Sequence, residues 1–158
     1  MNLIEQYIIP GLSLLPQNMD TPNARAMLAA IGLQESGFRD RKQVGGPARG
    51  VWQFERGGVN RGGIYGILTH PKTKDIIEGV CRTLYVPADA DICYGLVAYH
   101  DVLACCFARL LLWTLPGALP GPDGTDEGWR QYMAAWRPGK PRPADWPGNF
   151  KRAWIMVR

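Results

Sequence analysis

The sequence predicts a mainly α-helical single domain with one small non-helical lobe. Its 158 residues, 46% of them hydrophobic, suit one domain built around one core. Apolar residues recur at helical spacing in several segments, and capping or stop residues flank the clearest of these. From residue 39 to residue 63 the chain is instead rich in glycine and has only a brief apolar run, which indicates an irregular loop or a small hairpin.

Two helices are expected in the first quarter of the chain. Residues 3–9 predict a short helix that ends before Pro10, because proline interrupts the helical hydrogen-bond pattern. The second helix has clearer signals: Thr21 is a candidate N-cap and Pro22 suits the first helical position. Good helix formers then continue to Gly37, which predicts a C-terminal stop at that glycine.

The remaining helices are expected in the second half of the chain. Residues 70–85 predict one helix, and residues 89–114 predict either one long helix or two consecutive ones. Residues 129–136 also have a helical pattern. Several prolines then favour an extended path, and a final short helix is expected from Pro147.

The cysteines and histidines provide no pattern of a metal or redox site. None of the four cysteines has C-x-x-C spacing, and two of them are adjacent in an apolar run, so we expect buried, reduced thiols. A disulfide between Cys81 and Cys93 remains an alternative. His70 and His100 have no partnering ligand pattern, so the sequence predicts neither a metal nor another cofactor.

The apolar segments do not have the pattern of a leader or a membrane span. The first 17 residues carry Glu5, contain no Lys or Arg before the apolar part and are interrupted by prolines, which argues against a secretory signal. Residues 102–119 are the most apolar, but Arg109 and Pro116 interrupt them. We therefore expect a buried core helix there and no stable insertion into a membrane.

Glu35 is the candidate catalytic residue, at the expected end of the second helix. Burial beneath apolar neighbours and the negative end of the helix dipole would both raise the pKa of its carboxyl. A carboxylic acid that stays protonated near neutral pH suits general-acid cleavage of an acetal. The loop that follows can bring Gln53, a neutral donor and acceptor, and Trp52, an aromatic platform for a sugar ring, against the same substrate.

These residues resemble a known group of enzymes. The segments QESGF (residues 34–38) and GVWQ (residues 50–53) resemble the Glu-Ser and Gly-Leu-Met-Gln motifs of soluble lytic transglycosylases and goose-type lysozymes. The step of 18 residues from Glu35 to Gln53 is also similar, and the resemblance is clearest over residues 24–55. It implies a lysozyme-like α(+β) domain over residues 1–158, with the small lobe forming one side of a substrate groove.

The resemblance also implies an activity and further site residues. The family cleaves the β-1,4 bond between N-acetylmuramic acid and N-acetylglucosamine in peptidoglycan, which assigns Glu35 as general acid and base. The family's Ala-Tyr-Asn element has two candidate counterparts: Tyr99 in VAYH, and Trp136 in AAWRPGKP. The substrate-binding residues expected on this basis are Trp52, Gln53, Glu55, Tyr99 and Trp136.

The sequence leaves two reaction outcomes open. A hydrolase would use a second carboxylate, about 5–5.5 Å from the acid if retaining and about 6.5–9.5 Å if inverting. Asp40 and Glu55 are the candidates, and an extended strand would point Gln53 and Glu55 to the same side. In lytic transglycosylases one glutamate suffices, because the 6-hydroxyl of the sugar closes a 1,6-anhydro ring. The motifs favour transglycosylation.

The resemblance indicates a monomeric phage or prophage muramidase whose partner is the peptidoglycan glycan strand. Such an enzyme is made in the cytoplasm and acts in the periplasm or cell wall, within a virion or after release at lysis. The net charge of +4 suits an anionic wall polymer. One alternative is a non-catalytic wall-binding or virion structural protein with the same fold. Another is nucleic-acid binding by the basic, tryptophan-rich residues 129–158, but their basic residues are scattered among prolines, so we expect no nucleic-acid partner.

Overall fold

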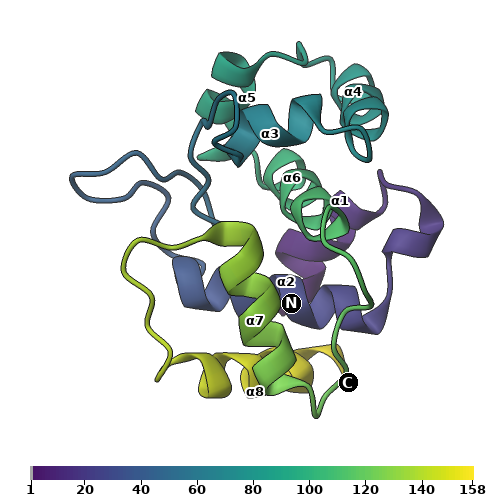
Figure 1. Ribbon diagram of the computed structural model, residues 1–158. Helices are drawn as coiled ribbons and strands as arrows, with labels where there is room; N and C mark the ends of the chain where they lie inside the picture. Colours follow the sequence, from purple (N-terminus) through teal and green to yellow (C-terminus); the bar gives the residue numbers. More distant parts are fainter. Residues whose placement is uncertain (1) are drawn as a thin grey trace.

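Helix α2 (Pro22–Glu35) lies at the centre of the computed structural model, which describes residues 2–158 (Figure 1). The predicted N-cap is confirmed, since the Thr21 hydroxyl accepts a hydrogen bond from the N–H of Ala24 at 3.1 Å. The predicted stop is confirmed as well, because Gly37 turns the chain with a φ of +64°. Residues 26–34 are all buried, so α2 packs against the rest of the protein on every side.

The first predicted helix does not end before Pro10. A π-helical turn (Ile4–Ile8) continues directly into α1 (Ile9–Leu12), and Pro10 lies in the first turn of α1. The N–H of Ile9 reaches back to the carbonyl of Ile4 across this wider turn. Proline is tolerated in a first helical turn, since the N–H groups there lack intrahelical partners. The expected end before Pro10 is therefore wrong.

Residues 2–158 form eight α-helices, so the fold is mainly α-helical. The helices predicted over residues 70–85, 129–136 and from Pro147 are confirmed, whereas α3 had no prediction. Residues 89–114 form two helices that meet at 113°, which is the second of the two alternatives. After α2, the helices are α3 (Gly63–Thr69), α4 (Lys74–Thr83), α5 (Ala90–Val97), α6 (Asp101–Trp113), α7 (Thr125–Trp136) and α8 (Trp146–Val157), and a 3₁₀ turn (Gln17–Met19) precedes α2.

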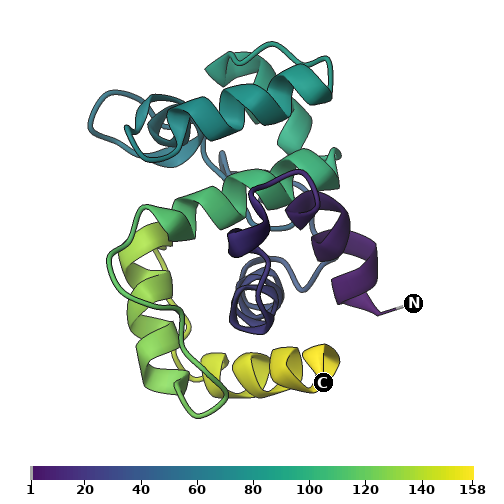
Figure 2. The same ribbon diagram turned by 90° about the vertical axis from the view of Figure 1, so that its right-hand side faces the viewer.

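Helix α6 lies between two groups of helices. Figure 2 shows α3, α4 and α5 on one side of α6, and α1, α2 and α8 on the other. Gly11 of α1 allows the backbones to approach closely, since a Cβ atom at this position would lie 2.5 Å from the Cβ of Cys105 on α6. All four cysteines are buried free thiols, so the expected burial is confirmed. Burial raises the pKa of Cys106 to about 12.

The segment between α2 and α3 is the predicted non-helical lobe. Among the described residues no strand forms, and the lobe has only isolated antiparallel bridges: Lys42 with Arg49, Arg49 with Phe54, and Gly58 with Gly62. The expectation of an irregular loop or small hairpin is confirmed. The β part of the expected α(+β) domain is limited to these bridges, because the many glycines favour tight turns over paired strands.

Within residues 2–158, no single helix is long and apolar enough to cross a membrane. The pair α5 and α6 meets the length and composition criteria only when taken together, across its sharp bend. Over the same residues, no group of three or more His, Cys, Asp or Glu side chains is placed to hold a metal ion.

Candidate functional site

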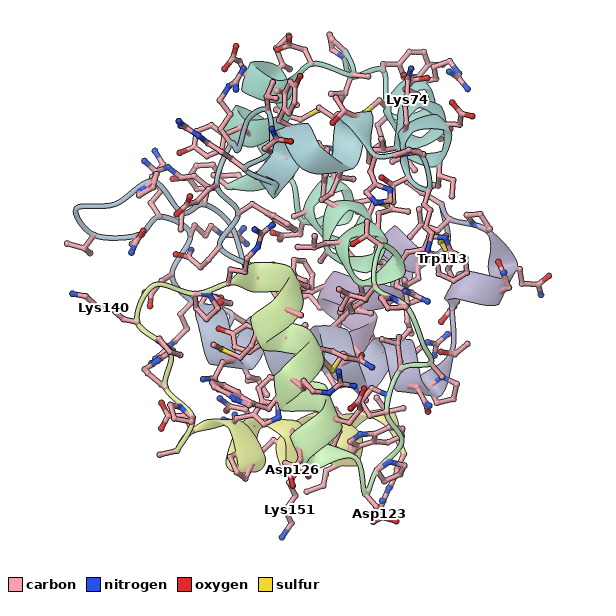
Figure 3. The ribbon with its side chains drawn as sticks, viewed as in Figure 1. Lys74, Trp113, Asp123, Asp126, Lys140 and Lys151 are labelled. Carbon is pink, nitrogen blue, oxygen red and sulfur yellow. The ribbon has the colours of Figure 1, made fainter. Side chains whose placement is uncertain are left out.

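A cleft of about 590 Å³ opens where the end of α2, the non-helical lobe and the end of α7 meet. Glu35 lines it from α2, and Gln53 and Glu55 line it from the lobe. Trp136 and the loop after α7 form the opposite wall, and Lys140 of this loop is labelled in Figure 3. The structure therefore places four of the six predicted site residues around one cleft: Glu35, Gln53, Glu55 and Trp136.

Glu35 is the last residue of α2 and is half-buried at the cleft. Its Oε1 atom accepts a hydrogen bond from the hydroxyl of Tyr132 at 2.5 Å. Burial is the largest influence on the carboxyl and raises its pKa above the ordinary value, while the Tyr132 hydrogen bond and the charge of Arg142 act in the opposite direction. The raised pKa has the direction that a general acid requires.

Tyr132 of α7, which holds Glu35, is not among the site residues predicted from the sequence. Its side chain is buried, and its ring stacks on Trp146 at 5.3 Å with an interplanar angle of 6°. Burial and the neighbouring Glu35 charge raise the pKa of Tyr132, so the phenol stays protonated and can donate its hydrogen bond to Glu35. Tyr132 precedes Trp136 by one helical turn, and this i, i+4 spacing is the signal that could have found it.

Trp136 lines the cleft from the end of α7. Its Nε1–H donates a hydrogen bond to the carbonyl of Trp52 at 2.8 Å, and its ring lies 5.9 Å from that of Phe54. The next residue, Arg137, has a φ of +47° and ends the helix. These contacts fix the indole at the cleft wall and leave it half-buried.

Trp52, which was expected to provide a sugar platform, does not line the cleft. The side chain is fully buried, and its Nε1–H donates a hydrogen bond to the carbonyl of Leu28 on α2 at 2.9 Å. A large apolar ring is stabilised by leaving water, and its one donor is satisfied inside the core. Trp52 instead supports the site from beneath, through its carbonyl contact with Trp136.

Tyr99, another predicted site residue, does not line the cleft either. It lies between α5 and α6 and is 65% exposed. The Arg41 guanidinium and the Lys42 ammonium lie 5.8 Å and 5.7 Å from the centre of its ring. Tyr99 is therefore an exposed contact between the lobe and α6, away from Glu35.

Gln53 and Glu55 line the cleft, although the backbone between them is not a regular strand. Gln53 has a φ of +52°, in the left-handed region, so the condition under which Gln53 and Glu55 would point to the same side, an extended strand, is not met. Its side-chain amide donates to the carbonyls of Gly50 at 2.9 Å and Asp40 at 3.2 Å. Glu55 is exposed, and Asp40, the other candidate carboxylate, is not among the lining residues.

The two neighbours of Glu35 in the QES motif hold the end of α2 in place. The Gln34 amide is buried, donates to the carbonyl of Arg142 at 2.9 Å and accepts from Asn149 of α8 at 2.9 Å. The Ser36 hydroxyl donates to the carbonyl of Val51 at 2.6 Å, which joins α2 to the lobe. These buried hydrogen bonds give Glu35 a fixed position relative to both walls of the cleft.

Three cationic side chains also line the cleft: Arg61, Arg137 and Lys140. Within the described part of the chain, none of the three forms an ion pair. Their charges remain available to a ligand, which favours a polar or anionic one.

Neither the known protein families, nor the curated proteins, nor the solved structures gave a match to this chain.

Proposed function

We propose that this protein is a lysozyme-like enzyme that cleaves the glycan strand of peptidoglycan, with Glu35 as general acid and base. The observation that carries the proposal is the environment of Glu35. A half-buried carboxyl with a raised pKa ends a core helix, is held by a buried phenol and opens onto a cleft. This arrangement suits protonation of a glycosidic oxygen.

The hydrogen bond from Tyr132 separates the roles of the two carboxyl oxygens. Tyr132 donates to Oε1, and Oε2 has no hydrogen-bond partner among residues 2–158. In the proposed reaction Oε2 carries the proton to the leaving oxygen of the substrate. The Tyr132 hydroxyl then stabilises the carboxylate that remains, which acts as the base in the second step.

We propose transglycosylation as the outcome, because no contact within residues 2–158 fixes a second carboxylate at the cleft. The Glu55 side chain is exposed and forms no hydrogen bond or ion pair within the described residues. A nucleophile or base for hydrolysis needs a fixed position relative to the sugar. With one fixed carboxylate, ring closure by the 6-hydroxyl of the sugar is the better-supported reaction.

The cleft supports the choice of a glycan substrate. Trp136 offers an aromatic wall, and the unpaired Arg61, Arg137 and Lys140 suit the acidic groups of wall polymers. In residues 129–158 the aromatic rings pack largely against one another, as in the Tyr132–Trp146 stack, so they do not form an open platform for nucleic-acid bases. We propose that the protein acts as a monomer on the cell wall, within a virion or after release at lysis.

The test compares the protein with its Glu35→Gln variant on purified peptidoglycan. We expect the variant to lose activity by about 10²–10⁴-fold, the usual contribution of a general acid. Mass spectrometry of the released muropeptides distinguishes the outcomes: 1,6-anhydro ends support transglycosylation, and reducing ends support hydrolysis. Glu55→Gln, which changes the other cleft glutamate in the same way, is the matched control and should retain activity if one carboxylate suffices.

Two results would contradict the proposal. Full activity in Glu35→Gln would remove this residue from its role. Binding to peptidoglycan without release of any product by the unmodified protein would instead favour the non-catalytic wall-binding or virion structural protein. Thermal unfolding of each variant, followed by circular dichroism, shows whether the folded state persists.

A further inference from the structure

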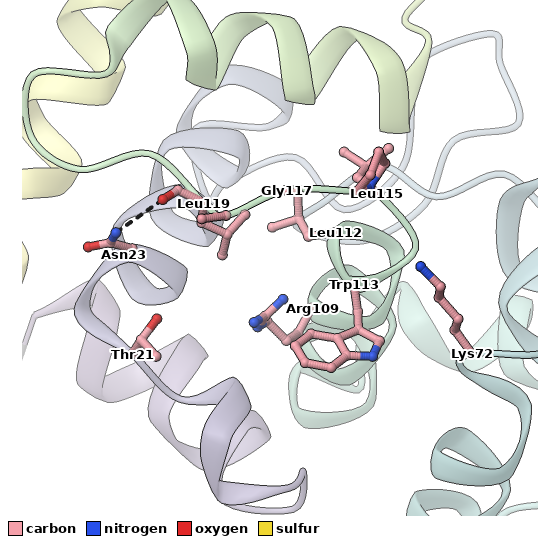
Figure 4. Close-up of a pocket in the computed structure, with 11 residues that line it drawn as sticks. Thr21, Asn23, Lys72, Arg109, Leu112, Trp113, Leu115, Gly117 and Leu119 are labelled. Atoms are coloured by element: carbon pink, nitrogen blue, oxygen red, sulfur yellow. Dashed lines mark hydrogen bonds between the residues drawn. The ribbon is translucent and has the colours of Figure 1, made fainter.

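A second pocket lies apart from the cleft and contains a buried arginine, Arg109, whose guanidinium lies 5.3 Å from the centre of the Trp113 ring. It has a volume of about 750 Å³ and shares no lining residue with the cleft. The start of α2, the end of α6 and the loop after α6 enclose it (Figure 4). The guanidinium of Arg109 points into the space between Thr21 and Trp113.

Arg109 has no acidic partner within residues 2–158. Arg109 is only 4% exposed, and its Nε–H donates a hydrogen bond to the carbonyl of Met19 at 2.8 Å. The two Nη atoms have no acceptor in the described residues. Asp20, the acidic residue next to Met19, forms a two-point ion pair with Arg25 at 2.7 Å and 2.9 Å and is thus already engaged.

A buried cation without a counterion is costly, so this pocket favours an anion. Burial lowers the pKa of Arg109 to about 10, which still leaves the guanidinium charged at neutral pH. Lys72 adds a second positive charge at the rim beside Trp113. Thr21 and Asn23 bring the positive end of the α2 dipole to the opposite wall.

The rest of the lining is mainly apolar. Leu112, Trp113, Leu115 and Leu119 contribute most of the hydrophobic surface around Arg109. The planar fork of a guanidinium fits a carboxylate through two parallel hydrogen bonds, and the leucine side chains suit a short hydrocarbon chain. We propose that this pocket binds an organic carboxylate carried on an apolar group, with Arg109 and Lys72 as its cationic contacts.

The probe is hexanoate, with 1-hexanol as its uncharged counterpart and inorganic phosphate as an anion without an apolar group. Intrinsic tryptophan fluorescence, to which Trp113 contributes as one of six tryptophans, and thermal unfolding report binding. We expect saturable binding of hexanoate with a dissociation constant of about 1 mM, an affinity ordinary for so small a ligand. Hexanol should bind at least about tenfold more weakly, because it lacks the charge-assisted hydrogen bonds.

Lys72→Glu and Arg109→Gln should each weaken hexanoate binding at least about tenfold, because each removes a cationic contact. Lys74→Glu is the matched control: it makes the same charge change two residues away, outside the pocket, and should leave binding unchanged. Lys72 is exposed, so its variant decides the test if Arg109→Gln fails to fold.

The proposal is overturned by an absence of saturable hexanoate binding, by equal binding of hexanol, or by phosphate binding as tightly as hexanoate. Equal loss in Lys74→Glu would also overturn it. Glu35→Gln should bind hexanoate with unchanged affinity. The test of the Arg109 pocket is therefore independent of the test of glycan cleavage.

Discussion

At Glu35 the protein holds one carboxyl between two opposing influences. Burial favours the protonated form, whereas the Tyr132 hydroxyl and the Arg142 charge favour the carboxylate. Since burial is the largest of these, the balance leaves the pKa raised. An acid that must give up a proton and later take one back benefits from both kinds of neighbour.

The same balance predicts how stability depends on pH. The pKa of Glu35 is higher in the folded protein than in the unfolded chain. The contribution of Glu35 to the free energy of unfolding is therefore most favourable at a pH below its pKa in the unfolded chain, and this contribution is lost as the pH rises through its pKa in the folded protein. Glu35→Gln should therefore unfold a few degrees higher than the unmodified protein at pH 7. The difference should shrink towards pH 4. A variant that is less stable at pH 7 would contradict burial as the dominant influence.

Removal of the Tyr132 hydroxyl should change the pH dependence of activity. Tyr132→Phe keeps the ring stacked on Trp146 but removes the hydrogen bond that favours the Glu35 carboxylate. The pKa of Glu35 should rise further, so the alkaline limb of the pH–rate profile should move up by about one to two pH units, since a hydrogen bond to a charged group is worth about 1.5–3 kcal/mol. Tyr65→Phe is the control and should leave the profile unchanged; an identical shift there would refute the assignment.

Helix α2 connects the core to the site. Its capped start and glycine stop place Glu35 at the cleft, and the residues on either side of Glu35 are fixed by buried hydrogen bonds. Close packing continues beyond the helix, because Gly32 lies directly against the ring of Phe38, whose own neighbours are Tyr7 and Trp52. The position of the site thus depends on small residues in α2 as much as on large ones.

Gly32→Ala should disturb this packing. The added Cβ would lie 2.5 Å from the Phe38 ring, so the ring must move, at a cost of about 1–3 kcal/mol in the free energy of unfolding. Gly66→Ala in α3 is the matched control, because its Cβ meets no atom within 4 Å. There the better helix former should stabilise the protein by up to about 1 kcal/mol. Urea denaturation measures the free energy of unfolding of both variants, and an equal change in the two would contradict the packing argument.

Across the whole molecule, the cleft forms between parts that are distant in sequence. The lobe joins α6 through Arg41, whose guanidinium contacts both carboxylate oxygens of Asp101 at 2.6 Å and 2.9 Å and also donates to the carbonyl of Ala98. The opposite wall of the cleft comes from the end of α7. Helix α8 packs along α2, the helix that carries Glu35. Each wall is thus attached to a different helix of the core.

Loss of the Arg41–Asp101 pair should loosen one wall. Asp101→Asn removes a partly buried two-point ion pair. We therefore expect the free energy of unfolding to fall by about 1 kcal/mol and the backbone amides of residues 39–50 to exchange hydrogen faster. Asp91→Asn is the matched control, since its pair with Arg56 is more exposed and should contribute little. Unchanged exchange in the Asp101 variant would show that other contacts hold the lobe.

Local signals in the sequence were sufficient for most helices and for the place of Glu35. The cap at Thr21, the stop at Gly37 and the glycine-rich lobe involve neighbours along the chain, and such interactions can be read without a fold. The short helix α3 was missed because it begins within the glycine-rich segment. The end of the first helix was wrong because a π turn accommodates Pro10.

Long-range contacts decided the rest of the site. Tyr132 reaches Glu35 across 97 residues, and Trp52 enters the core through a hydrogen bond across 24 residues. Helical spacing can place Tyr132 on the same face of α7 as Trp136, but neither partner, Glu35 for Tyr132 or Leu28 for Trp52, can be read from the sequence, since each contact depends on how whole helices pack. Glu35 and Trp136 could thus be chosen from the local sequence, whereas the hydrogen bond from the Tyr132 phenol to Glu35 and the burial of the Trp52 indole follow from tertiary packing alone.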